Sequence, residues 1–455
     1  MIKRSNQKNS ILADENILRL LLNLSAPATI GMITMALYNL VDTIFVGRGV
    51  GPLAIAGLAI VFPFQMLVLA LGQMIGMGAA SIISRSLGAE DKERAEKALA
   101  NMILSTSVFG ITLAVSGNIF LSPLLRAFGA TEAIMPYSRE YLQVILMGTV
   151  FHIFLISSNN VIRAEGRAAI AMGTMIVSAV LNIILDPVFI FVLKMGVRGA
   201  AIATVISQAV AAGYIIGFFK SGISELQLRQ RFLKPDWEIL REKFAIGLSA
   251  FVRQAAGSIF IIVVNHSLAY YGTDLTLAAF GVIHRLLRFT IMPVFGIAQG
   301  MQPIVGYNYG ARRPALARKA ISLATWGATI MAITGFILLF AFPATLIAIF
   351  TDNRELIATG SKALRIIVCV QPLIGVQIIG ATTFQALGKA LPSLFLSMSR
   401  QLLFLIPLLL ILPRLLALNG VWLAFPLADI MSFFITLIIL IPQLKKLLRP
   451  QQQVI

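Results

Sequence analysis

Two aspartates stand inside apolar stretches of this chain, where an ionised side chain is energetically unfavourable. Asp42 lies within residues 36–46, and Asp186 lies within residues 180–191. An ionised carboxylate at the middle of a bilayer costs at least ~2.5 kcal/mol, so acids in such places usually face a bundle interior and serve the path of an ion or a substrate. The two acids therefore predict a buried site that handles charge.

A polar partner accompanies each acid at helical spacing. Tyr38 stands four residues before Asp42, and Asn182 stands at the same distance before Asp186. Residues at this spacing share one face of a helix. Pro187 follows the second acid directly, and because proline has no N–H it leaves the backbone carbonyl four residues earlier without its helical partner. Each acid is thus expected to lie beside a second polar group.

A third segment completes the set of oxygen atoms. In GlyAlaAlaIleAlaThr (199–204), Ala200 and Thr204 share a face, and the small residues allow close helix approach. Carboxylates, an amide, hydroxyls and a free carbonyl suit either a carboxyl group that holds a proton or a hard cation that prefers oxygen ligands. The alternative is structural: a buried acid that pairs with an arginine or binds a helix end.

The composition predicts a membrane protein. The chain has 455 residues, of which 58% are hydrophobic and 12% are charged, whereas soluble domains carry roughly 25% charged residues. Apolar runs of ~20 residues, long enough to cross ~30 Å of hydrocarbon, recur from end to end. We expect an all-α integral membrane protein with twelve transmembrane helices, at residues 17–41, 53–80, 97–121, 137–160, 169–193, 199–219, 244–268, 277–303, 319–341, 357–385, 392–412 and 420–441.

The sequence repeats itself at an offset of 222 residues. LeuAlaIleAlaGlyLeuAla (53–59) corresponds to LeuThrLeuAlaAlaPheGly (275–281), and ArgAlaGluGlyArgAla (163–168) corresponds to GlnAlaLeuGlyLysAla (385–390). Each half holds an even number of spans, so we expect two six-helix lobes related by pseudo-two-fold symmetry along the membrane normal. The predicted domains are an N-terminal lobe (1–219), a polar cytoplasmic linker (220–243) and a C-terminal lobe (244–455).

The two acids have no counterpart in the second half. At the offset of the repeat, Asp42 corresponds to Val264 and Asp186 corresponds to Leu408, and both of these residues are apolar. The second half keeps the scaffold and lacks these acids. We therefore expect the ion chemistry to be confined to the first half.

Topology, rather than nucleic-acid binding, explains the net charge of +18. Lys and Arg concentrate on alternate loops, for example around Lys92, Arg229 and Lys445, and the intervening loops hold fewer of them. This asymmetry is the positive-inside pattern. It predicts a multi-pass protein of the cytoplasmic (inner) membrane with both termini in the cytoplasm, where the basic loops contact anionic lipid headgroups.

The sequence carries no signature of catalysis or of a thiolate metal cluster. Cys369 is the single cysteine, which excludes an internal disulfide. A Walker A lysine motif, HisGluxxHis and GlyxSerxGly are all missing from the chain. We therefore expect neither an enzyme nor direct use of ATP, and no cofactor.

Seven segments together carry a family pattern, although any one of them alone is weak. They are LeuTyrAsnLeuValAspThrIlePheVal (37–46), ArgSerLeuGlyAla (85–89), AsnAsnValIleArgAlaGluGly (159–166), LeuAsnIleIleLeuAspProValPheIle (181–190), GlyAlaAlaIleAlaThr (199–204), GlyIleAlaGlnGlyMetGlnProIleValGlyTyrAsnTyrGlyAla (296–311) and PheGlnAlaLeuGlyLys (384–389). In these segments the chain resembles the multidrug and toxic compound extrusion (MATE) family, on its DinF/MepA-like side. The resemblance covers essentially the whole length.

The resemblance implies two six-helix lobes and drug efflux coupled to a cation. It also implies a first-lobe site for Na⁺ or H⁺ built from Asp42, Asn182, Asp186, Thr204 and the carbonyl of Ala200, with Tyr38 and Asn159 beside them. Another branch of the family uses acids of the second lobe instead. Spans 277–303 and 357–385 of this chain contain no acid in their interiors, so coupling through a second-lobe carboxylate is not expected.

Three polar residues of the second half are weaker candidates for contact with a substrate. His284, Arg285 and Gln302 all lie on the span 277–303. They are candidates to line the cavity of the second lobe. The plainer interpretation is a polar helix face or pairing with a backbone carbonyl.

These observations predict a secondary active exporter of amphipathic, often cationic organic compounds, driven by H⁺ or Na⁺ through alternating access. The alternative within the same fold is a flippase or exporter for a lipid-linked saccharide or another specific metabolite, for which Arg253, Arg285, Arg288 and Arg400 are the candidate phosphate-binding cations. A channel or a membrane enzyme has less support. The expected partners are small-molecule drugs or metabolites and membrane lipids, with no nucleic acid, and a monomer is expected.

The predicted orientation is testable with reporters fused after Gln443. A reporter that is active only in the cytoplasm should be active at this position, because the loops on this side carry the positive charge. A reporter that is active only outside the cytoplasm should be inactive. Activity of the external reporter alone would overturn the topology.

Overall fold

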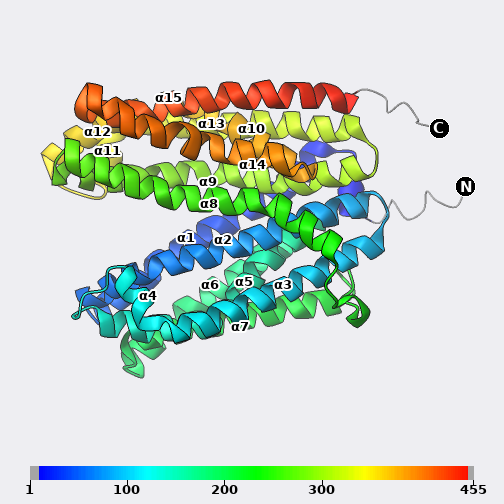
Figure 1. Cartoon of the computed structure of the whole chain (residues 1–455), viewed down its shortest axis with the longest axis horizontal. Helices are drawn as coiled ribbons and strands as arrows, with labels where there is room; N and C mark the ends of the chain where they lie inside the picture. The colour runs from blue at the N-terminus through cyan, green and yellow to red at the C-terminus, as the bar shows by residue number, and fades with distance from the viewer. Residues whose placement is uncertain (1–9, 449–455) are drawn as a thin grey trace, which may run out of the picture. The chain divides into compact units, whose positions relative to one another are not determined.

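The computed structural model describes residues 10–448, and its regular elements in that range are helices (Figure 1). The first and last residues, whose cytoplasmic location the sequence predicts, lie outside the described range. The first half contains η2 (Ile11–Ala13), α1 (Ile17–Gly49), α2 (Pro52–Gly88), α3 (Lys92–Ile119), α4 (Leu121–Ala127), α5 (Met135–Ala164), α6 (Ala168–Pro187), η3 (Val188–Val192), α7 (Gly196–Lys220) and η4 (Gln230–Phe232). The second half contains α8 (Trp237–Tyr271), α9 (Asp274–Gly310), α10 (Pro314–Ala341), α11 (Pro343–Ala348), α12 (Arg354–Val368), η5 (Gln371–Leu373), α13 (Ile374–Ala386), α14 (Ala390–Met398), η6 (Ser399–Leu405) and α15 (Ile406–Leu448).

The predicted all-α fold with twelve transmembrane helices is confirmed, although some spans are not single straight helices. Arg354–Val368 and Gln371–Ala386 together make one span with a bend of 42°. The apolar stretch Ala390–Lys446 has 57 residues, which at 1.5 Å per residue is ~85 Å of helix against ~30 Å of hydrocarbon. It breaks at Ala417, whose φ of 48° and ψ of −135° are not helical, so it holds two spans.

The chain divides into two compact units, which we name unit 1 and unit 2. Unit 1 contains Ile30–Gly247 and the short stretch that ends at Ala13, and unit 2 contains Asp14–Thr29 and the chain from Leu248 onward. This division differs from the predicted lobes, because the first turns of α1 belong to unit 2 and the predicted linker belongs to unit 1. The helices α1 and α8 therefore continue from one unit into the other without a loop.

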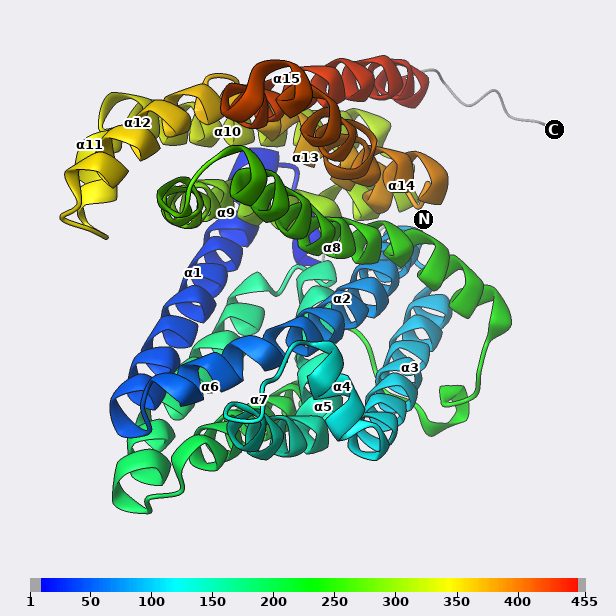
Figure 2. The same cartoon turned by 60° about the vertical axis from the view of Figure 1, so that its left-hand side comes forward.

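Unit 1 is built around α2 and α5, which pack along one another (Figure 2). Glycines of α2 face α5: a Cβ on Gly72 would lie 2.9 Å from the Cβ of Ile156, and a Cβ on Gly76 would lie 2.7 Å from the Cα of Ser157. The hydroxyl of Ser157 donates a hydrogen bond of 3.0 Å to the carbonyl of Gly72. Small residues let membrane helices approach closely, so this pair forms the packed centre of unit 1.

The predicted cytoplasmic linker is a loop with one short 3₁₀ helix, η4, and buried acids attach it to unit 1. Glu165, directly after α5, accepts hydrogen bonds from the hydroxyl of Ser224 (2.8 Å) and the backbone N–H of Glu225 (3.1 Å). Glu96 forms an ion pair of 3.1 Å with Arg229. Burial raises the pKa of Glu165 to about 8. These contacts explain why the linker belongs to unit 1.

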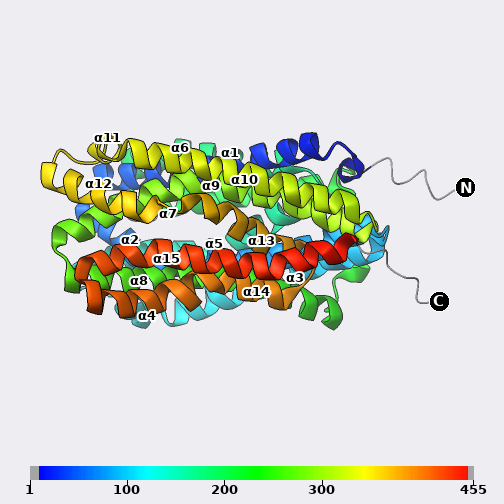
Figure 3. The same cartoon turned by 90° about the horizontal axis from the view of Figure 1, so that it is seen from above.

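Unit 2 packs around α9, α10 and α13, and the short helices α11 and α12 lie together at one end of α10 (Figure 3). Gly375 of α13 packs against the backbone of α10, where an added Cβ would lie 2.8 Å from the backbone nitrogen of Thr329. Aromatic rings fill part of the core: Phe260 of α8 and Phe425 of α15 meet edge to face with their centroids 5.7 Å apart. Such pairs add to the stabilisation that apolar burial gives.

The start of α8 is fixed within unit 1. Glu242 forms an ion pair of 2.7 Å with Arg85. Lys243 is fully buried, and its Nζ donates hydrogen bonds to the backbone carbonyl of Asn101 (2.9 Å) and to the hydroxyl of Ser105. A buried charged group destabilises a protein unless its hydrogen bonds are made, so these bonds hold α8 in one position against α3.

Gly78 of α2 permits this position of α8, because a Cβ added there would lie 2.0 Å from the carbonyl oxygen of Lys243. Gly78→Ala should therefore push α2 and α8 apart and lower the melting temperature of the purified protein, since overpacking typically costs about 1–3 kcal/mol. Gly213→Ala on α7 is the matched control: among the described residues nothing lies within 4 Å of a Cβ there, and Ala suits a helix better than Gly. Equal melting temperatures for the two variants would contradict this packing.

Candidate functional site

The two predicted acids meet in unit 1, where α1 and α6 bring them together. Asp42 is 7% exposed, and Asp186 is fully buried. Their carboxyl groups are in hydrogen-bonding contact. Two ionised carboxylates repel each other at this range, so a hydrogen bond between them requires a proton on one of the two. The pair is therefore built to hold a proton.

Asn182 ties the acid pair to α7. Its Nδ2 donates hydrogen bonds to Oδ1 of Asp186 (3.1 Å) and to the hydroxyl oxygen of Thr204 (3.3 Å). The first bond follows from the four-residue spacing within α6, and the second joins α6 to α7. Ala200, one turn before Thr204 on the same face, is fully buried. The structure thus gathers the predicted ion-site side chains into one cluster.

The backbone changes its winding directly after Asp186. The helix α6 ends at Pro187, and a π-helical segment, η3, follows it. Such wide turns often occur at functional sites. Gly199 of α7 packs against this segment, since a Cβ added there would lie 2.9 Å from the carbonyl oxygen of Phe189. The glycine that opens the predicted 199–204 segment therefore lets α7 approach the backbone beside the acid.

Three buried oxygen atoms of this cluster have no hydrogen-bond partner among the described residues. They are Oδ1 of Asp42, Oδ2 of Asp186 and Oδ1 of Asn182. A buried polar atom without a partner costs roughly 1–3 kcal/mol, and more when the group is charged. Native proteins keep few such atoms, and each one has a specific reason. The cluster therefore offers three acceptor oxygens to a proton or a small cation.

Two tyrosines lie close to the acids. The charges of both carboxyl groups act on the hydroxyl of Tyr38 and on that of Tyr141, a residue of α5. Tyr141 accepts a hydrogen bond of 3.3 Å from Nε2 of Gln65 on α2. The spacing to Asp42 predicts Tyr38, whereas Tyr141 and Gln65 were not predicted. Their one signal in the sequence is a polar group inside an apolar span.

Asn159 does not lie beside the acids. Its Oδ1 accepts a hydrogen bond of 2.7 Å from the hydroxyl of Thr174 on α6. Thr174 precedes Asn182 by about two turns, or ~12 Å along the helix axis. The resemblance predicts the residue type within its motif, but the depth of Asn159 depends on how α5 and α6 pack.

The polar residues predicted in the second half lie in unit 2. His284 packs against the rings of Phe260 and Phe280, with centroids 6.4 Å and 5.9 Å away. Arg285 is exposed. Gln302 is buried, and its Nε2 has no hydrogen-bond partner in the described part of the chain. His284 therefore belongs to an aromatic cluster, and contact of these three residues with a substrate stays a prediction.

A family model described as MatE matches residues 27–188 and again residues 249–411. The chain belongs to the MatE family. The two matches begin 222 residues apart, which is the offset of the internal repeat. Both halves of this MatE protein are therefore copies of one family unit.

Similar proteins support the same assignment. The multidrug export protein MepA of Staphylococcus haemolyticus is 26% identical over 94% of each chain. The MATE multidrug transporter DinF-BH, solved in complex with a drug molecule, is 45% identical, covers 94% of this chain and 96% of its own, and has a TM-score of 0.88. A MATE structure in the bent conformation is 28% identical, covers 95% of this chain and 96% of its own, and has a TM-score of 0.90. The chain is thus a MATE family transporter of the DinF/MepA type.

This MatE chain also holds a buried acid in its second half that the sequence analysis did not single out. Asp429 of α15 is buried and forms an ion pair with Arg400 of η6. Its backbone carbonyl accepts a hydrogen bond of 2.9 Å from Nε2 of Gln377. Asp429 is therefore the structural kind of buried acid, because a fixed positive charge compensates it.

A proton shared by Asp42 and Asp186 predicts an infrared signature of the purified protein. The C=O stretch of protonated carboxylic acids should contain a component at neutral pH that shifts in D₂O and that the double variant Asp42→Asn/Asp186→Asn loses. Glu165→Gln is the control, because Glu165 is buried elsewhere in unit 1 and has a pKa of about 8, so it contributes a component of its own. A difference spectrum without a component specific to the double variant would contradict the shared proton.

Proposed function

We propose that this MatE protein exports small organic molecules in exchange for an ion that binds the Asp42–Asp186 pair. The observation that carries this proposal is a buried pair of acids in hydrogen-bonding contact, with three acceptor oxygens of the cluster left open. Ionisable groups at membrane depth are unfavourable for stability and mark ion and substrate pathways. An exchanger needs a site whose charge changes in each transport cycle, and this pair is such a site.

A proton is the coupling ion that this geometry supports best. A hydrogen bond between two carboxyl groups needs one proton and no further ligand. A Na⁺ ion would need several oxygen atoms around it, and the side chains of Asp42, Asn182, Asp186 and Thr204 are those that would hold it. We propose no cofactor besides the coupling ion, and we make Na⁺ the second arm of the test.

Amphipathic and often cationic organic compounds are the proposed substrates. DinF-BH was solved with a drug molecule bound, and MepA is named a multidrug export protein. A deprotonated carboxylate attracts an organic cation, and a bound proton or Na⁺ removes that attraction. Ion and substrate thus compete through one charge, and each lowers the affinity of the other by the same factor because coupling free energies are reciprocal.

The alternative, a flippase for a lipid-linked saccharide, needs cations that bind phosphate. Among the candidate arginines, Arg400 is already paired with Asp429. Arg285 and Arg288 are exposed on α9. This function leaves the acid pair of unit 1 without a role, so the ion-coupled exporter explains more of the buried chemistry.

The proposed cellular setting follows from the loop charges. Basic residues concentrate on one set of alternate loops, and this asymmetry orients membrane proteins. We therefore propose a multi-pass monomer of the cytoplasmic membrane with both termini in the cytoplasm.

Asp42→Asn and Asp186→Asn should each abolish ion-driven transport of ethidium, a fluorescent organic cation, while the protein still inserts into the membrane. The reason is that an amide cannot cycle between a charged and a neutral form. The measurement is ethidium transport in everted vesicles, with a proton gradient and a sodium gradient imposed separately and protein levels compared. Asp274→Asn is the control, because this acid is exposed in the first turn of α9.

The vesicle assay separates the possible outcomes. We expect drive by the proton gradient in wild type and in Asp274→Asn. Drive by the sodium gradient alone would replace the proton by Na⁺ at the same site. Drive by neither gradient would refute the exporter, and normal transport by Asp42→Asn or Asp186→Asn at normal protein level would refute the assigned role of that acid.

A further inference from the structure

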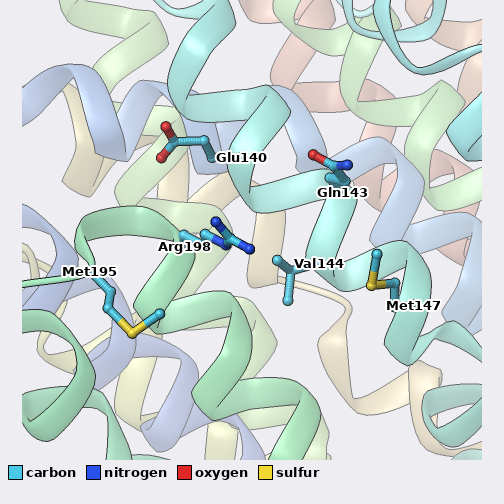
Figure 4. Close-up of a pocket in the computed structure, with 6 residues that line it drawn as sticks. All are labelled: Glu140, Gln143, Val144, Met147, Met195 and Arg198. Atoms are coloured by element: carbon cyan, nitrogen blue, oxygen red, sulfur yellow. The ribbon is translucent and has the colours of Figure 1, made fainter. Parts of the chain in front are cut away.

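Unit 1 has a groove on its surface between α5 and α7, at the end where both helices begin. The groove has a volume of about 520 Å³. Its walls are Glu140, Gln143, Val144 and Met147 of α5, with Met195 and Arg198 at the start of α7 (Figure 4). None of these six residues belongs to the acid cluster, and the proposed export function assigns them no role.

The groove carries one negative and one positive group. Glu140 and Arg198 are both exposed, and neither forms an ion pair within the described residues. Figure 4 shows them on different helices toward one end of the groove, with Met147 toward the other end. Gln143 adds an amide between the charged and the apolar parts. A ligand whose head carries both a negative and a positive group complements this arrangement.

An apolar stripe continues from the charged end along both helices. On α5, Met147 and Phe151 follow Glu140 at helical spacing, and Met147 is 64% exposed. On α7, the exposed Ile206 lies two turns after Arg198. Glu140 and Phe151 are ~16 Å apart along the helix axis, which is about half of the ~30 Å thickness of the hydrocarbon. The groove and its stripe therefore match the length of one lipid leaflet.

We propose that this groove binds a phospholipid with an ethanolamine headgroup. Arg198 binds the phosphate, because a guanidinium donates paired hydrogen bonds to phosphate oxygens. Glu140 accepts a hydrogen bond from the ammonium group of the headgroup. The acyl chains lie along Met147 and Phe151, and soft methionine side chains adapt to chains of different shape.

The charges select this lipid among the common phospholipids. A choline headgroup has no N–H, so it cannot donate a hydrogen bond to Glu140. A glycerol headgroup has no ammonium and leaves the lipid with a net negative charge, which Glu140 repels. The ethanolamine lipid is the one that satisfies Glu140 and Arg198 at the same time. It comes from the leaflet at the end of unit 1 where α5 and α7 begin.

The test is native mass spectrometry of the purified full chain, titrated separately with phosphatidylethanolamine, phosphatidylcholine and phosphatidylglycerol of the same acyl composition. We expect the ethanolamine lipid to bind ~10-fold more tightly than the other two, the size of effect that one charge-assisted hydrogen bond gives. Equal binding of the three lipids, or preference for the glycerol lipid, overturns the proposal. The readout is binding alone, so it is independent of whether the protein transports anything.

Variants assign the two headgroup contacts. Glu140→Gln should abolish the preference for ethanolamine over choline, because the amide does not attract the ammonium. Arg198→Gln should weaken the ethanolamine and choline lipids together, because both carry the phosphate. Arg139→Gln is the matched control, since Arg139 is exposed at the same helix end and does not line the groove. A preference that survives in Glu140→Gln, or that is lost in Arg139→Gln, contradicts the proposed site.

Discussion

A carboxyl group inside a membrane must either give up its charge or find an opposite one, and the two units of this protein meet that constraint in different ways. Asp429 is paired with Arg400, so its charge is compensated and fixed. Asp42 and Asp186 have each other, with no basic side chain among the groups that act on them. A pair of acids changes its charge when a proton enters or leaves, whereas an ion pair does not. The first arrangement suits stability, and the second suits coupling.

Duplication of the family unit explains the scaffold but not the chemistry. The MatE model matches both halves, while the positions equivalent to the acid pair hold apolar residues in the second half. Irregular backbone accompanies the buried acids in both units: η3 follows Asp186, and η6 contains Arg400, the partner of Asp429. A π-helical turn widens the helix locally and changes the direction of the side chains around it. In each unit, a local departure from the regular helix therefore positions the charged group.

The sequence predicts the spans because the thickness of the hydrocarbon sets their length, and it predicts contacts within one helix because helical spacing determines them. The bond between Asn182 and Asp186 is such a contact. Contacts between helices are different: Tyr141 and Gln65 are 76 residues apart, and their meeting depends on how α2 packs against α5. Asn159 lies away from the acids for the same reason, since no local pattern determines the register of two packed helices.

Helix α1 connects the chemistry of unit 1 to unit 2. Its first turns, through Thr29, belong to unit 2, and the remainder, which carries Asp42, belongs to unit 1. Pro27 lies inside α1 just before this division and removes one backbone hydrogen bond there. Bending of a helix concentrates at such a residue, while the turns on either side move as rigid segments. A displacement of α1 that accompanies a change of charge at Asp42 therefore reaches unit 2 along the helix itself.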